Sequence, residues 1–154
     1  MDNHAHQSDH YVHLGVMAFL SFLAMYALMY SMVDSFGNVY MSLNQVYMAA
    51  LMAAPMVVIE LVVMRMMYKD ARLNALILVG SVVVGVGMFV LIRQQTAIGD
   101  RQFLRSMIPH HSGAILMCRE ASLQDQELKN LCQEIISSQQ REIDQMTAKL
   151  RQAQ

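Results

Sequence analysis

The residues of this sequence best suited to chemistry gather between positions 107 and 118. This stretch carries two thioethers, two adjacent imidazoles and a thiol, from Met107, Met117, His110, His111 and Cys118. Soft metal ions prefer sulfur and imidazole donors, whereas hard cations prefer oxygen. At 3.6 residues per turn, these side chains fall within about three turns of one helix. The stretch therefore predicts a binding site for a soft metal ion such as Cu(I) or Ag(I).

The composition indicates that much of the chain lies in a membrane. Hydrophobic residues make up 55% of the 154 positions and charged residues only 15%, where about 25% is usual in soluble domains. The chain has 16 Met and no Trp, but Met also fills gaps in apolar cores, so its abundance alone does not indicate metal binding. A net charge of -1 without a basic cluster argues against nucleic acid as a partner.

Three apolar runs are long enough to cross a bilayer, since about 20 apolar residues span the hydrocarbon core. They cover residues 14–33, 46–68 and 75–92. We expect residues 14–92 to form a three-helix transmembrane region. A polar tail over residues 1–13 precedes it and holds four of the six histidines. Such a tail collects metal ions or is simply solvated, and the sequence favours neither interpretation.

The second apolar run carries a carboxyl group within a stripe of methionines. Met48, Met52, Met56 and Met64 recur with Glu60 every four residues and so follow one helix face. A carboxyl group inside a bilayer is expected to be paired, protonated or functional. A transmembrane metal path is one interpretation of the stripe, but methionine packing is the more common one.

Basic residues in the loops give a weak prediction of orientation. The link at 65–74 contains three Lys or Arg residues, and the segment 93–105 contains three that are more widely spaced. Positively charged loops stay in the cytoplasm, and these two lie on opposite sides of the membrane. The denser charge of the first link favours a cytoplasmic amino terminus and a carboxyl-terminal region outside.

From Asp100 onward the apolar period becomes that of two amphipathic helices, which we expect to form an antiparallel hairpin around Asp125, a residue type that caps helix N-termini. The first stripe comprises Phe103, Met107, His110, Ala114, Met117 and Ala121. The second comprises Leu128, Cys132, Ile135, Gln139, Glu142 and Met146. The facing pairs expected are His111 with Gln139, Met107 with Glu142 or Ile143, Leu104 with Met146, and Cys118 with Cys132.

Three interpretations of the polar groups in these stripes remain open, because buried polar groups need partners. They share a metal ion, or His110 and Glu142 pair in the core, or the histidines lie on the surface of a helix kinked by Pro109. The two cysteines likewise form a disulfide on an oxidising side of the membrane or act as two further thiolate ligands on a reducing side.

Residues 98–150 resemble the domain of unknown function 305 family. The resemblance is carried by the run Met107-Ile108-Pro109-His110-His111 and by the spaced Gln139, Glu142 and Met146, and the whole chain resembles the branch with three membrane helices. It implies a ferritin-like helical bundle, exported to the periplasm or cell surface, with copper bound through Met and His. It thereby implies as ligands Met107, His110, His111, Met117 and Met146, with Glu142 as a ligand or as a partner of one. Leu116 departs from the acidic residue that many members carry there.

The expected fold is therefore all-α, with three transmembrane helices followed by a hairpin that is half of a ferritin-like four-helix bundle. We expect a homodimer, because two hairpins complete such a bundle. The expected function is soft-metal buffering, resistance or hand-over to a metal-transport partner at a bacterial inner membrane. The alternative is a structural or assembly subunit without metal. We expect no enzyme, since a di-metal centre needs more Glu residues than Glu134 and Glu142. The full set of candidate ligands is Met107, His110, His111, Met117, Cys118, Cys132, Gln139, Glu142 and Met146.

Overall fold

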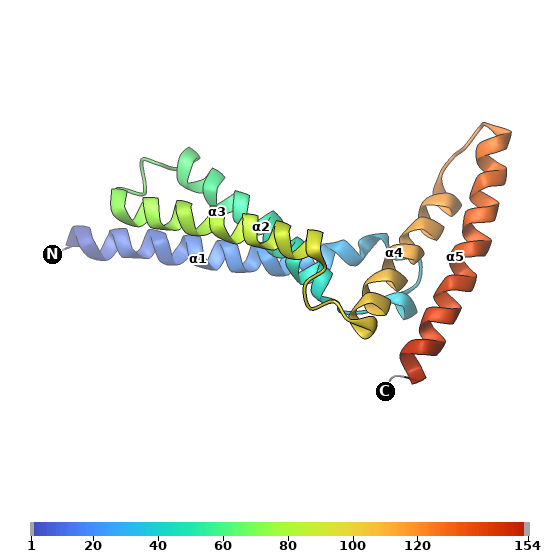
Figure 1. The fold of residues 1–154 in the computed structure, drawn as a ribbon. Coiled ribbons are helices and arrows are strands. Elements are labelled where there is room, and N and C mark those ends of the chain that lie inside the picture. The colour runs from blue at the N-terminus through green and yellow to red at the C-terminus, as the bar shows by residue number, and fades with distance from the viewer. Residues whose placement is uncertain (1, 153–154) are drawn as a thin grey trace. The chain divides into compact units, whose positions relative to one another are not determined.

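The structure is a computed structural model that describes residues 2–152, with side chains described for residues 9–152. Over this range the chain is all-α and contains no strand (Figure 1). The α-helices are α1 Asp2–Leu28, α2 Leu43–Val63, α3 Ala71–Gln94, α4 Asp100–Glu120 and α5 Gln126–Gln152, and two 3-10 turns are η1 Met29–Met32 and η2 Phe36–Asn38.

The chain divides into two compact units. The first, here called the membrane unit, comprises Met1–Leu28 and Val46–Thr96. The second, the hairpin unit, comprises Met29–Gln45 and Ala97–Gln154. The residues between α1 and α2 therefore fold with the carboxyl-terminal helices, although the two are far apart in the sequence. We call residues 29–45 the α1–α2 segment.

Three helical stretches have the length and hydropathy of membrane spans, as predicted. They are Asp9–Met32, Leu43–Val63 and Ala71–Gln94. The second ends five residues earlier than expected, so Glu60 lies in the last turn of α2 and not deep inside the span. The chain is thus a membrane protein, and its intramembrane carboxyl group lies near one end of a helix.

The predicted polar tail is not separate from the first span. α1 begins at Asp2 and continues through the polar residues into the apolar run. The side chains of His4 and His6 lie outside the described residues. The backbone from residue 2 onward is part of a 27-residue helix, and the solvation of this tail and its binding of metal ions stay predictions.

The membrane unit packs through small residues on α2. Its buried positions there are Ala49, Ala53, Ala54 and Leu61. Small side chains let helix backbones approach each other in lipid, where apolar burial gives little driving force between helices. A second contact, formed by Leu14 of α1 with Leu61 and Tyr68, closes one end of this unit.

The hairpin unit is an antiparallel pair of helices with an aliphatic core. Figure 1 shows α4 and α5 side by side, joined by a short turn. The core residues are Ile108 and Ile115 of α4 with Ile143 and Leu150 of α5. Asp125 precedes α5, and its carboxylate accepts hydrogen bonds from the backbone amides of residues 127 and 128 at 2.7 and 3.0 Å. The predicted hairpin and its N-cap are therefore confirmed.

Candidate functional site

The face of α4 that packs against α5 lies one residue away from the predicted stripe. Ile108 and Ile115 are buried on this face, whereas Phe103 and Met117 of the predicted stripe are 48% and 54% exposed. A shift of one residue turns a helix by about 100°. The expected core stripe of the first helix is therefore wrong by one position, and most of its residues point away from α5.

His111 is the histidine that enters the hairpin core. Its Nδ1 donates a hydrogen bond to the backbone carbonyl of Met107 at 2.9 Å, because a carbonyl oxygen only accepts. Its Nε2 lies 2.7 Å from a carboxyl oxygen of Glu142 on α5. Since Nδ1 already carries a proton, Nε2 and the carboxyl group share one more, as imidazolium with carboxylate or as imidazole with carboxylic acid. The His111 side chain is 9% exposed and that of Glu142 is 52% exposed.

This pairing corrects the partner of Glu142. The expected core pair of His110 with Glu142 is wrong in its histidine, because His110 is exposed and His111 is buried. The expected pairing of His111 with Gln139 is likewise replaced by Glu142. Both ring nitrogens of His111 are engaged, so this side chain binds a metal ion only if its Nε2 exchanges Glu142 for the metal.

His110 and Met107 share the outer side of α4. They are three residues apart, a spacing that places both side chains on one helix face. The His110 ring lies edge-on to that of His111, with 6.2 Å between the ring centroids. The adjacent histidines therefore have different environments, one ring inside the hairpin and one at its surface. Pro109, which directly precedes the two histidines, is buried within the continuous helix α4.

Met107 and Met146 lie at the same level of the hairpin. His111 pairs with Glu142, and one step of four residues along each helix in opposite directions leads to Met107 and Met146. Four residues are close to one helical turn, so the two methionines form the next level. Both are partly buried, and Met146 packs against the hairpin core.

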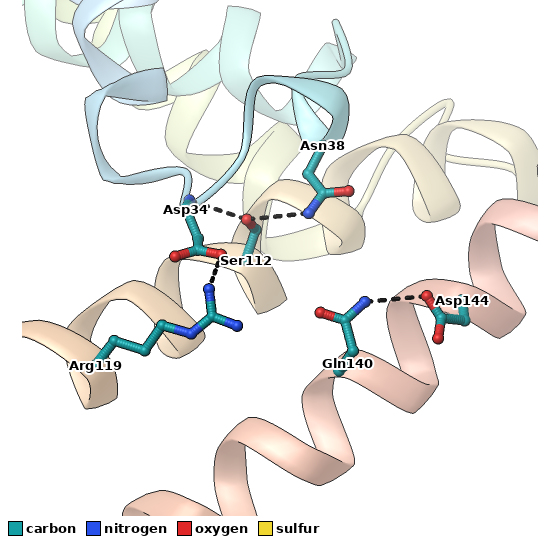
Figure 2. Close-up of polar contacts among 6 residues, drawn as sticks. All are labelled: Asp34, Asn38, Ser112, Arg119, Gln140 and Asp144. Carbon is teal, nitrogen blue, oxygen red and sulfur yellow. Dashed lines mark hydrogen bonds and ion pairs between the residues drawn. The ribbon is translucent and has the colours of Figure 1, made fainter.

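The side of α4 opposite His110 is covered by the α1–α2 segment. Ser112 is fully buried, and its hydroxyl oxygen accepts hydrogen bonds from the backbone amide of Asp34 at 3.0 Å and from the side-chain amide of Asn38 at 3.3 Å. The Asp34 carboxylate forms an ion pair with Arg119 at 2.6 Å (Figure 2). A Cβ on Gly113 would lie 3.3 Å from a backbone oxygen of the segment, so the segment approaches the helix closely here.

The α1–α2 segment also borders one side of α5. Its residues Gly37, Asn38 and Tyr40 line a hollow together with Gln140 and Asp144 of α5, and Gln140 donates a hydrogen bond to Asp144 at 3.0 Å (Figure 2). The other side of both helices is left uncovered by the segment. We call this surface the open face. By helical position it comprises Phe103, Met107, His110, Ala114 and Met117 of α4 and Leu128, Leu131, Ile135, Gln139, Glu142 and Met146 of α5.

The nine candidate ligands divide into three groups. The open face holds Met107, His110, Met117, Gln139, Glu142 and Met146. The hairpin core holds His111, and the remaining two residues are Cys118 and Cys132. Among the described side chains, no group of three or more His, Cys, Asp or Glu residues is placed to hold a metal ion. A metal site on the open face therefore depends on its methionines.

Cys118 and Cys132 are joined by a disulfide that connects α4 to α5 near the turn. The two cysteines lie opposite each other, as the hairpin register predicts. Of the two open alternatives, the structure has the disulfide, and in this form neither sulfur is a thiolate ligand. Disulfides persist in oxidising compartments and are rare in reducing ones.

Sequence reasoning missed the contacts of Ser112, Asp34 and Arg119. Asp34 is 78 positions from Ser112 and 85 from Arg119 along the chain, and helical periodicity carries no information about partners so distant. The one available signal was the small pair Ser112-Gly113 within a run of larger residues. Small residues in a helix mark positions where another backbone approaches closely.

The methionine stripe of the membrane unit is exposed at its beginning and partly buried further along. Met48 and Met52 are 39% and 44% exposed, and Met56 is partly buried. Glu60 accepts a hydrogen bond from the hydroxyl of Tyr68 at 3.5 Å. Burial, and then the nearby carboxylate of Glu60, raise the pKa of the Tyr68 phenol above its ordinary value. The intramembrane carboxyl group therefore has a donor partner within its own unit.

Comparison with known proteins shows similarity to one protein family and to a viral relative. A family model described as "Domain of unknown function (DUF305)" matches residues 60–150. An uncharacterized protein of Acanthamoeba polyphaga mimivirus is 34% identical over 136 residues, which cover 86% of this chain and 88% of the relative. No solved structure matches the chain. The family match includes both hairpin helices and also α3, so it extends beyond the segment 98–150.

Proposed function

We propose that this chain, which belongs to the DUF305 family, binds Cu(I) or Ag(I) on the open face of its hairpin as a membrane protein. The metal ion is cargo, which the protein buffers at the membrane or hands to a metal-transport partner. Such buffering confers resistance, because it lowers the concentration of the free ion.

The observation that carries this proposal is the placement of soft donors on the open face. Met107 and Met146 lie at one level, and His110 follows on the same side of α4. Thioether and imidazole donors suit Cu(I) and Ag(I). The exposed His110 ring supplies the nitrogen donor, and Met117 extends the same helix side further along.

The pair of His111 and Glu142 lies next to this site and helps to position it. Their 2.7 Å contact joins α4 to α5 one turn away from the level of Met107 and Met146. The bond of His111 to the Met107 carbonyl also connects the pair to the first thioether residue. Residues that orient metal ligands are commonly as important to affinity as the ligands are. We therefore assign His111 a positioning role and Glu142 that of its partner.

The proposed location is a bacterial inner membrane with the hairpin unit on the extracytoplasmic side. The link between α2 and α3 is rich in basic residues, which favours the cytoplasm for that loop. The α1–α2 segment and the hairpin fold as one unit and so share the other side. The Cys118–Cys132 disulfide is consistent with an oxidising compartment there.

The test is titration of the purified protein with Cu(I) and, separately, with Ag(I). His110→Ala and Met107→Ala are expected to weaken binding by at least about tenfold, the usual effect of disturbing a metal site. The matched control is Met66→Ala, which removes a methionine that is 81% exposed in the membrane unit. Unchanged affinity in both open-face variants would rule out this site.

A second candidate function is that of a structural or assembly subunit without metal. Its supporting observation is that His111 and Glu142 already satisfy each other, so the polar groups of the core require no metal. Purification of the intact protein from a membrane extract distinguishes the two functions. A stoichiometric partner protein, with no copper or silver by elemental analysis, would favour the subunit.

The open face is also the surface through which we propose that the protein forms a homodimer. Phe103, Met117, Leu128 and Leu131 are each about half exposed on it, with values between 48% and 54%. Large exposed apolar patches mark interaction sites on soluble domains, and these four side chains lie on one face of the hairpin. Leu131→Glu is expected to shift the protein in detergent from dimer to monomer in analytical ultracentrifugation. A monomeric parent protein would refute this proposal.

A further inference from the structure

The α1–α2 segment exposes an apolar tip that the proposed metal site does not use. The Phe36 side chain is 97% exposed, and that of Met41 is 69% exposed. A large aromatic side chain in full contact with water is unfavourable, and burying one stabilises a protein substantially. This tip therefore lacks the surface that would cover it.

The segment is fixed in a conformation that keeps Phe36 outside. Asp34 and Asn38 stand two residues before and after Phe36, and both donate hydrogen bonds to the buried hydroxyl of Ser112. The ion pair of Asp34 with Arg119 adds a third attachment to α4. With both flanks attached to the helix, Phe36 is held as the first residue of a short 3-10 turn, and its side chain is exposed.

The position of Phe36 in the sequence places it close to the membrane surface. It follows the last residue of the first span, Met32, by four positions and precedes the first residue of the second span, Leu43, by seven. At no more than about 3.6 Å per residue, four positions extend at most about 14 Å. The tip therefore stays within reach of the lipid headgroups.

The charge of the tip fits the same location. Residues 35–42 contain no charged side chain, and the carboxylate of Asp34 is neutralised by Arg119. An uncharged, apolar tip enters the boundary between headgroups and acyl chains without transferring a charge from water. Tyr40 and Met41 continue the apolar character toward α2.

We infer that Phe36 and Met41 insert into the interfacial layer of the same bilayer that the three spans cross. The partner of this surface is lipid, and the attachment through Ser112 transmits the anchoring to α4. The hairpin unit is thereby held against the membrane at the α1–α2 segment. This inference does not rest on metal binding and survives if the metal site is refuted.

The experiment uses the absence of Trp from the chain. The Phe36→Trp variant has a single indole, and its site tolerates the exchange because the side chain is 97% exposed. The full-length variant is reconstituted in phosphatidylcholine vesicles whose acyl chains are brominated near the headgroup. The control is Gln124→Trp, at an exposed position in the turn between α4 and α5 that is not part of the open face. Iodide in the aqueous phase provides the opposite quencher.

The expected result is that bromolipid quenches the indole fluorescence of the Phe36→Trp variant more strongly than that of the Gln124→Trp control, and that iodide quenches it less. A shift of its emission to shorter wavelength than the control accompanies this difference. Equal quenching by bromolipid at both positions would overturn the inference. A short-wavelength emission that persists in unbrominated detergent and is not quenched by bromolipid would also overturn the inference, because it would assign the tip to a protein partner.

Discussion

The membrane unit and the hairpin unit use the same residue types in opposite ways. The membrane unit buries Ala49, Ala53 and Ala54 and exposes Met48 and Met52. The hairpin unit buries Ile108 and Ile115 and gathers methionines beside a histidine. The difference reflects the solvent, because water drives large aliphatic side chains together whereas lipid does not. Methionine therefore has a different role in each unit: it is exposed at Met48 and Met52 in the membrane unit and lies beside a histidine in the hairpin unit.

The carboxyl groups of the two units show a parallel contrast. Glu60 is paired with the Tyr68 hydroxyl, a neutral donor at 3.5 Å. Glu142 is paired with the His111 imidazole at 2.7 Å. A membrane carboxyl group needs a partner mainly to tolerate the bilayer. The hairpin carboxyl group instead shares a proton with a residue next to the proposed metal donors.

The largest expected effect tests the different packing of the two units. Ile108→Ala should reduce the free energy of unfolding by about 2 to 5 kcal/mol, because it leaves a cavity in the hairpin core. Val62→Ala in α2, where the side chain is 61% exposed, should change it by less than about 0.5 kcal/mol. Denaturant unfolding of both variants in detergent, followed by circular dichroism, checks the difference. Equal losses would show that the two units do not differ in this way.

The next effect concerns the disulfide, which belongs only to the hairpin unit. Its cysteines are 14 positions apart, and closing a loop of that size stabilises a protein by about 3 kcal/mol in the chain-entropy model. Dithiothreitol should therefore lower the unfolding midpoint of the parent protein. The Cys118→Ala and Cys132→Ala double variant should have the lower midpoint without reductant, and dithiothreitol should not change that midpoint. A midpoint that is independent of reductant in the parent would contradict the prediction.

A smaller effect is expected when the partner of His111 is removed. Glu142→Ala should cost about 1 kcal/mol, the low end for an unpaired polar group, because Glu142 is half exposed and water partly replaces it. Glu134→Ala on the same helix removes an exposed carboxylate and should cost less than about 0.5 kcal/mol. Thermal unfolding of the two variants measures the difference. A cost for Glu134→Ala that matches or exceeds that of Glu142→Ala would count against the pairing.

The smallest expected effect compares how closely other atoms approach a helical glycine in each of the two units. Helical Gly→Ala changes gain up to about 1 kcal/mol where space allows. At Gly85 the new methyl group would lie 3.6 Å from the Ala54 side chain, an ordinary contact. At Gly113 it would lie 3.3 Å from the backbone oxygen of Met32. Unfolding measurements should therefore find Gly85→Ala more stable than Gly113→Ala. The reverse order would contradict the close packing of the α1–α2 segment against α4.

Much of the fold follows from local patterns in the sequence. The three spans are specified by the length and hydropathy of their apolar runs. The hairpin follows from two amphipathic segments separated by a short break with Asp125 as N-cap. The position of Cys118 opposite Cys132 follows from folding the two segments about that break. All three depend on neighbours within one or two helices, which sequence periodicity describes well.

The tertiary structure decided which side of α4 is buried, and with it which histidine enters the core. The stripe containing His110 and the adjacent one containing His111 have the same helical spacing, so periodicity does not distinguish them. The α1–α2 segment covers the side of Ser112 and α5 covers the side of His111, which leaves His110 and Met107 outside. That choice rests on contacts between residues about 80 positions apart, and no local pattern in the sequence encodes them.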